Sequence, residues 1–248
     1  MEIQLLKKAE ILGELMYYYN SKGELISFTL GELKYQGKSS KIFRVKDECY
    51  LKQYFSYSTS TVRMDLELFH ILKKLNHPHT NKTLELYYDR TKAKSKEYLM
   101  SHIQDLAVDA YKYLYIEDNY VDIMKESTEY LLYNLQELER LTNIFTELGI
   151  WMRDFKRENT VYYQDKIMLI DLDCCKLARN NNHYDIQRNN KECLQELFID
   201  LFEKCKSYSY RYEDEVFDLF ANEGTTLTSS VSKKLCKCKT PLDYIKKN

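Results

Sequence analysis

One short segment, residues 150–173, constrains this chain more than any other. It carries a carboxylate, a cation and an amide at fixed spacing, and a second carboxylate directly after the apolar run Ile167–Ile170: Asp154, Lys156, Asn159 and Asp171. A short apolar run bounded by polar residues is typical of a buried strand. The segment therefore predicts a polar loop, then a strand, then a second loop that begins with a carboxylate.

The residue types in this segment match what phosphoryl transfer from ATP requires. A carboxylate orients the attacking hydroxyl, a cation neutralises charge on the moving phosphoryl group, and oxygen ligands hold Mg²⁺. The alternative is a helix–turn–strand unit with solvated charges, because an Arg-Asp pair followed by lysine is common. Four matched positions after a helical pattern that stops at Gly149 favour the catalytic interpretation.

The spacing resembles the catalytic loop and the metal-binding loop of protein kinases. The resemblance implies that Asp154 orients the acceptor hydroxyl and that Lys156 neutralises the γ-phosphoryl group. It also implies that Asn159 and Asp171 hold Mg²⁺. It covers about residues 25–205 of the chain.

The same resemblance implies an ATP-binding half upstream of this segment. Lys52 matches the strand lysine that binds ATP phosphates, and Glu67 lies where its partner in an ion pair would be, with Asp65 as the alternative partner. Read alone, each would be an ordinary surface charge. Four further ATP-binding positions come from the phosphate-covering hairpin, the adenine roof and a hinge strand: Gly37, Ile42, Met100 and His102.

The chain also departs from the protein kinase pattern. Tyr35 and Ser40 stand where the phosphate loop has its flanking glycines, and Met152 replaces the histidine before Arg-Asp. Asp173 replaces a glycine, which removes a flexible joint. Fewer than twenty residues separate Asp173 from the next predicted helix near Lys191, so an activation segment would be very short. Asp185 and Asp200 are both candidates for a helix carboxylate that braces the catalytic loop.

Hydrophobic periodicity predicts strands with one main helix first and helices afterwards. The predicted helices cover 2–19, 60–75, 104–124, 127–149, 191–206 and 211–221, and the predicted strands 25–30, 41–45, 49–54, 84–88 and Glu97–His102. This order predicts an α+β, two-lobed protein kinase-like fold. Residues 1–100 would form the N-lobe, an antiparallel sheet with one main helix, and residues 101–248 a reduced, mostly helical C-lobe.

Composition narrows the classes of partner. Lys plus Arg (37) nearly balances Asp plus Glu (38), so bulk nucleic-acid binding is not expected. No apolar run approaches the roughly 18 residues that span a bilayer, and the N-terminus lacks the layout of a signal peptide. We therefore expect a cytoplasmic protein with reduced cysteines, although secretion as an effector by a dedicated machine would leave no trace here.

Together these features predict an ATP- and Mg²⁺-dependent kinase that phosphorylates a hydroxyl. Lysine two residues after Asp154 resembles the Ser/Thr protein kinase loop, so a protein substrate is expected. The reduced C-lobe leads to one further expectation and one alternative. The expectation is an activating protein partner, and the alternative is a small-molecule acceptor instead of a protein. A non-catalytic pseudokinase is the remaining alternative, supported by the glycine-poor loop and by Tyr50 near the expected adenine site.

Overall fold

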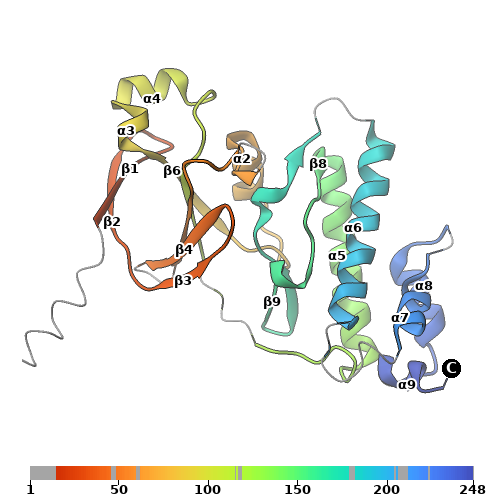
Figure 1. Ribbon diagram of the computed structural model, residues 1–248. Coiled ribbons are helices and arrows are strands. Elements are labelled where there is room, and N and C mark those ends of the chain that lie inside the picture. Colours follow the sequence, from red (N-terminus) through yellow and green to blue (C-terminus); the bar gives the residue numbers. More distant parts are fainter. Residues whose placement is uncertain are drawn as a thin grey trace, which may run out of the picture. The chain divides into compact units, whose positions relative to one another are not determined.

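The computed structural model divides into two compact units (Figure 1). It describes residues 15–45, 49–59, 62–114, 116, 119–178, 182–203, 205, 212–222 and 224–247. The first unit comprises residues 1–76 and 82–115, and the second comprises 77–81 and 116–248. The α+β class is confirmed. The expected border near residue 101 is corrected to residue 115, because β7 (Ala110–Leu114) is an inner strand of the first unit's sheet.

The first unit is built on a seven-stranded antiparallel sheet with the order β2-β1-β6-β7-β5-β4-β3. Its strands are β1 (Leu15–Asn20), β2 (Leu25–Thr29), β3 (Leu33–Gln36), β4 (Ser40–Val45), β5 (Cys49–Tyr54), β6 (Thr83–Asp89) and β7. One face buries a cluster of apolar side chains that includes Tyr18, Leu51, Tyr87 and Ala110. The strands predicted over 25–30, 41–45, 49–54 and 84–88 are confirmed, whereas β3 was not predicted.

The sheet curls because its two edge strands, β2 and β3, are joined by a short stretch of chain. β2 pairs with β1, and β3 pairs with β4. Between them, Gly31 N donates to Arg44 O at 3.1 Å, and Arg44 N donates to Glu32 O at 3.0 Å. A Cβ atom on Gly31 would lie 2.4 Å from Arg44 O. Only glycine therefore permits this close approach.

The helices in the described part of the first unit are α2 (Leu66–Lys74), α3 (Arg90–Ala93) and α4 (Lys96–His102). α2 buries Leu68, Phe69 and Leu72 and contacts β6. The Asp65 carboxylate caps α2 by accepting hydrogen bonds from Glu67 N and Leu68 N. The helix predicted over 60–75 is confirmed from Leu66 onward.

Three predicted elements of the first 124 residues are wrong in part or in full. Residues 15–19 lie in strand β1 rather than in a helix, since pairing with β2 and β6 outweighs the helical spacing; residues 1–14 lie outside the described part. Glu97–His102 is helical because Ser95 caps α4, its Oγ accepting from Tyr98 N at 3.1 Å. The helix predicted over 104–124 is replaced by turns and by strand β7.

The second unit is mainly helical. Its helices are α5 (Thr128–Glu147), α6 (His183–Glu203), α7 (Glu213–Phe220), α8 (Leu227–Leu235) and α9 (Pro241–Ile245). Two short antiparallel pairs join β8 (Ile150–Trp151) with β11 (Lys176–Leu177) and β9 (Thr160–Tyr163) with β10 (Lys166–Leu169), and two 3-10 turns are η2 (Arg157–Asn159) and η3 (Leu172–Cys174). Among the residues that the structure describes, no helix is long and apolar enough to cross a membrane.

Helix α5 forms the core of this unit, with Leu135, Leu138, Leu141 and Phe145 almost fully buried. It begins and ends as its sequence predicts, capped by Ser127 and followed by Gly149 at φ +69°. The C-terminal helices pack on it, because α8 contacts α5 and Thr128 N donates to Lys239 O at 2.8 Å. α8 and α9 were not predicted.

Candidate active site

The loop between β8 and η2 holds Asp154 in an unusual backbone conformation. Asp154 has φ +58°, which is uncommon for a residue with a Cβ atom. The Asn159 amide secures it: Nδ2 donates to Asp154 O at 2.7 Å and to Asp154 Oδ2 at 3.2 Å. Asn159 is buried, whereas the Asp154 side chain is about half exposed at 48%. The loop therefore presents a fixed carboxylate to solvent.

Lys156 lies against this carboxylate. Its Nζ is 2.9 Å from Asp154 Oδ1 and 3.1 Å from Asp154 Oδ2. The hydrogen bond to Asp154 raises the pKa of Lys156, and burial opposes this only in part. Lys156 therefore stays protonated at neutral pH, and a cation lies beside the exposed carboxylate.

Side chains of helix α6 bind backbone groups at both ends of the loop. The fully buried Asn190 accepts from Met152 N at 2.8 Å and donates to Ile150 O at 2.9 Å. Further along α6, Asp200 accepts from Arg157 N at 2.7 Å. Of the two carboxylates that the sequence left open, Asp200 is thus the one that braces the loop.

The role of Asn190 was missed. Asn190 lies just before the helix predicted over 191–206, so the sequence pattern did not place it on that helix.

The second carboxylate, Asp171, follows β10 at φ +61°. The two loops are joined directly, because Ile170 N donates to Asn159 O at 2.9 Å. Asp171, Asp173 and Cys174 each place one potential ligand atom within 4.8 Å of the others. Cys174 Sγ also lies 3.8 Å from Asp154 Oδ2. Its thiol is therefore near Asp154 as well as near Asp171 and Asp173.

This donor set suits a hard divalent cation such as Mg²⁺, which prefers oxygen ligands. Asp171 and Asp173 offer carboxylate oxygens. The Nδ2 group of Asn159 donates hydrogen bonds to Asp154. The Oδ1 atom of Asn159 is therefore the oxygen that could bind a cation. A thiol is a poor ligand for Mg²⁺, so Cys174 is a neighbour of this set rather than a member of it.

A pocket of about 450 Å³ lies beside the same loop in the second unit. It is lined by Tyr120, Arg157, Glu158, Thr160, Val161, Tyr162 and Ile170. Val161 follows the Asp154 loop in sequence and Ile170 precedes Asp171, and Asn119 N donates to Tyr162 O at 3.3 Å near the entry of the chain into this unit. The sequence did not identify Tyr120, because nothing in its local pattern marks it.

In the first unit, Lys52 lies on an inner strand of the sheet. It is 5% exposed and stands opposite Ile42 on β4 and Tyr111 on β7. Its Nζ lies 5.9 Å from the ring centroids of both Tyr54 and Tyr111. A lysine so deeply placed on a sheet is not an ordinary surface charge, since lysine is almost never buried without a specific reason.

The remaining predicted ATP-binding residues occupy different settings. Glu67 is exposed in the first turn of α2, and Asp65, the alternative partner of Lys52, is the N-cap of that helix. Gly37 lies in the tight β3–β4 turn, where its N–H donates to Ser40 O at 2.9 Å. Met100 and His102 are exposed on α4, where the His102 ring stacks on Tyr98 at 4.3 Å.

The predicted hinge strand is therefore wrong. Met100 and His102 lie on a helix, so they do not offer the backbone groups of a strand for hydrogen bonds to adenine.

The two sets of candidate site residues fall in separate units. Asp154, Lys156, Asn159 and Asp171 come together in the second unit, while Lys52, Ile42 and Glu67 belong to the first. No protein-family model matches the chain, and no curated protein matches it either. The function must therefore be argued from the chain's own residues.

Proposed function

We propose that this protein is an ATP- and Mg²⁺-dependent kinase that transfers the γ-phosphoryl group to a hydroxyl of a protein Ser or Thr. The observation that carries the proposal is the fixed, exposed Asp154 carboxylate, which Asn159 secures and Lys156 accompanies. Asp171 starts the adjoining loop, which Ile170 ties to Asn159. Few other reactions require this combination of groups at one loop.

In the proposed reaction each residue has one task. Asp154 accepts a hydrogen bond from the acceptor hydroxyl and orients it, and Lys156 leaves its ion pair with Asp154 to neutralise the γ-phosphoryl oxygens. Asp171 and Asn159 would hold Mg²⁺, which supplies charge neutralisation at the phosphates. Asp200 and Asn190 keep the loop from changing shape as these charges move.

The first unit supports the proposal through the order of its elements. A tight hairpin between β3 and β4 precedes β5, which carries the buried Lys52, and α2 follows with Glu67 in its first turn. Protein kinases place their phosphate-binding lysine on a strand, between a glycine loop and a helix that carries a glutamate. The likeness in element order is independent of the loop motif in the second unit.

The acceptor is the part of the proposal most open to test. Helix α6 begins at His183 rather than near Lys191, so the stretch after Asp173 is even shorter than the sequence predicted. A short stretch leaves little surface for a peptide, which favours a small-molecule acceptor as the second candidate. The turn at Gly37, closed by its bond to Ser40, is the feature that favours a pseudokinase.

The test is a transfer assay with radiolabelled γ-phosphate ATP, Mg²⁺ and either the chain alone or a generic basic protein. Labelled Ser or Thr that disappears in Asp154→Asn and in Lys52→Met supports the proposal. Consumption of ATP only when a pool of small hydroxyl compounds is added would favour the second candidate. Binding of ATP with no turnover under any condition would make the chain a pseudokinase.

A further inference from the structure

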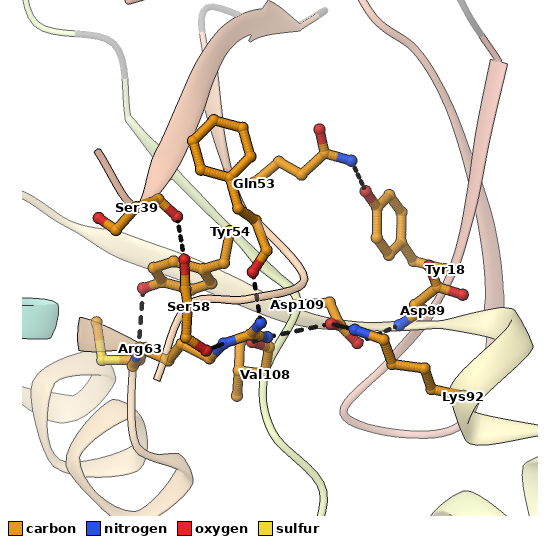
Figure 2. Close-up of polar contacts among 12 residues, drawn as sticks. Tyr18, Ser39, Gln53, Tyr54, Ser58, Arg63, Asp89, Lys92, Val108 and Asp109 are labelled. Atoms are coloured by element: carbon orange, nitrogen blue, oxygen red, sulfur yellow. Dashed lines mark hydrogen bonds and ion pairs between the residues drawn. The ribbon is translucent and has the colours of Figure 1, made fainter. Parts of the chain in front are cut away.

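A buried arginine occupies the centre of the first unit. Arg63 is 4% exposed and lies just before α2. Figure 2 shows its guanidinium surrounded by acceptors from two segments. Nη2 donates to Phe55 O at 2.7 Å and Nε to Ser58 O at 3.0 Å, while Nη1 donates to Val108 O at 2.7 Å. A guanidinium presents its donors in a fixed fork, so these carbonyls are held at defined positions.

The charge of Arg63 is matched by a buried carboxylate. Asp109, 6% exposed, accepts from Arg63 Nη1 at 3.1 Å. Its other oxygen accepts from Asp89 N at 2.9 Å, and Lys92 of α3 completes the group through an ion pair with Oδ1. Because the arginine is paired and its donors are satisfied, it can remain buried as a cation.

The segment that Arg63 holds also holds the β3–β4 turn. Phe55 N donates to Ser39 O at 2.9 Å, and Ser58 Oγ donates to the same oxygen at 2.6 Å. Ser39 lies two residues after Gly37, in the turn where the kinase resemblance expects the phosphate-covering loop. Phe55 and Ser58 therefore link Arg63 to the turn, because each of them binds both the Arg63 guanidinium and Ser39 O.

Tyr54 connects the same arginine to Lys52. The Arg63 guanidinium lies 5.5 Å from the Tyr54 ring centroid, and Lys52 Nζ lies 5.9 Å from it. The Tyr54 hydroxyl accepts from Met64 N at 3.0 Å, in the backbone that leads into α2. Tyr54 and Lys52 are on the same face of β5, since they are two residues apart.

We propose that Arg63 is the positioning residue of the nucleotide-binding half of this protein, with Asp109 as its counter-ion. It holds three elements in register: the β3–β4 turn through Phe55 and Ser58, the Lys52 strand through Tyr54, and the start of α2. This inference rests on the proposed function, because the three elements are those assigned to ATP. A change at Arg63 acts on ATP through them, without contact between Arg63 and the nucleotide.

The test compares Arg63→Met and Asp109→Asn with Arg44→Met, the same chemical change at an exposed arginine of β4. The expected result is an increase of about tenfold or more in KM for ATP, with kcat within about threefold of wild type. Amide hydrogen exchange should quicken in residues 37–40 and 66–74. Arg63→Lys, which keeps the charge but loses the fork, should fall between wild type and Arg63→Met.

The outcomes separate this inference from the function on which it rests. A lower melting temperature with unchanged KM and unchanged exchange in the two segments makes Arg63 a purely structural residue and overturns the inference. If the wild-type protein fails to use ATP, the proposed function fails, while the exchange data still decide whether Arg63 holds the turn and α2. If Arg63→Met does not fold, Asp109→Asn, which keeps the residue's size, carries the same readouts.

Discussion

Three charged residues of the first unit and two of the second differ sharply in exposure. In the first unit Lys52, Arg63 and Asp109 are each at most 6% exposed and lie within a dense set of contacts. In the second unit the side chains of Asp154 and Lys156 are 48% and 46% exposed. Burial fixes geometry, whereas exposure lets a group meet a substrate. Under the proposed function, the buried charges of the first unit would position groups, and the exposed loop of the second unit would meet the substrate.

The support beneath the two sets differs as well. Arg63 is an ion that binds backbone carbonyls, so its support depends on charge as well as on hydrogen bonds. The exposed loop of the second unit is held by the neutral amides of Asn159 and Asn190 and by Asp200. The two amides fix the backbone without adding charge near Asp154, and Asp200 is the one charged group among these three supports. This difference leads to predictions for two separate quantities, the rate of phosphoryl transfer and the free energy of unfolding.

The largest effect is expected at the exposed carboxylate. Asp154→Asn should lower the rate of phosphoryl transfer by about 1,000-fold, within the range usual for loss of a positioned acid–base group. Stability should change little, because the side chain is exposed and Asn tolerates a positive φ. Steady-state transfer assays and thermal melting measure the two quantities on the same sample.

Asp165→Asn is the matched control for this change. Asp165 is also exposed and also has a positive φ, +59°, but it lies in the β9–β10 turn. Its substitution should leave the transfer rate within about twofold of wild type. An equal loss in both variants would mean that the Asp154 effect comes from the backbone and not from the carboxylate.

The next effect is expected on stability and should be greater in the first unit. Arg63→Met leaves Asp109 buried with less compensation, which typically costs about 3–5 kcal/mol. Asn190→Ala removes a neutral amide and leaves Met152 N and Ile150 O without their partner, at about 2 kcal/mol. Urea unfolding of both variants gives the comparison. A larger loss of unfolding free energy in Asn190→Ala than in Arg63→Met would contradict this expected order.

A smaller contrast separates two glycines, one from each unit. Gly31→Ala should destabilise by about 2 kcal/mol or more, since the added Cβ meets Arg44 O and the backbone must shift. Gly149 has φ +69° with open space around it, so Gly149→Ala should cost only about 1 kcal/mol. Equal losses in chemical denaturation would show that the curl of the sheet does not depend on close approach at Gly31.

The smallest expected effect is a pH dependence in the second unit. His79 is fully buried, and burial is the main cause that lowers its pKa below the ordinary value of 6.5. Its Nδ1 lies 2.7 Å from Ile167 O and must carry the hydrogen, so the buried Nε2, which has no hydrogen-bond partner, would take the added proton. Its charged neighbours have opposed effects, with Glu137 raising its pKa and Lys166 lowering it.

The sign of this pH effect follows from proton counting. Between the lowered pKa in the folded state and about 6.5, the unfolded chain binds more protons, so the free energy of unfolding falls as pH drops below about 6.5. The neighbouring His77, whose pKa burial also lowers, adds in the same direction. Urea midpoints at pH 7.5 and 5.5 should differ in wild type and differ less in His79→Phe. His102→Gln, at an exposed position of α4, should retain the wild-type difference.

Local patterns in the sequence predicted the loop that carries Asp154 and, with Asp200 as one of two candidates, part of its support, but not Asn190. The spacing of Asp154, Lys156 and Asn159 within six residues places them on one loop whatever surrounds it. The strands β4 and β5 and helix α5 followed from periodicity in the same way. Arg63 and Asp109 lie far apart in sequence and look like surface charges, and only tertiary packing shows that they are buried together.

Two of the errors have different physical causes. The tyrosine-rich stretch at 15–19 fits helical spacing, but β1 gains partners on both sides from β2 and β6. Residues 97–102 are apolar enough for a strand, yet the Ser95 cap starts a helix there, and the inner position in the sheet goes to β7. Non-local pairing, which a single sequence does not display, decides β1. The Ser95 cap that starts α4 is a local interaction.

The most direct test of the central claim is transfer of the labelled γ-phosphoryl group from ATP by the full chain, with Mg²⁺ and with EDTA. The account predicts labelled Ser or Thr with Mg²⁺, none with EDTA, and a loss of about 1,000-fold in Asp154→Asn while Asp165→Asn remains active. Transfer that persists unchanged in Asp154→Asn would contradict the assignment of the reacting carboxylate. Absence of both ATP binding and transfer in the folded wild-type protein would contradict the proposed function itself.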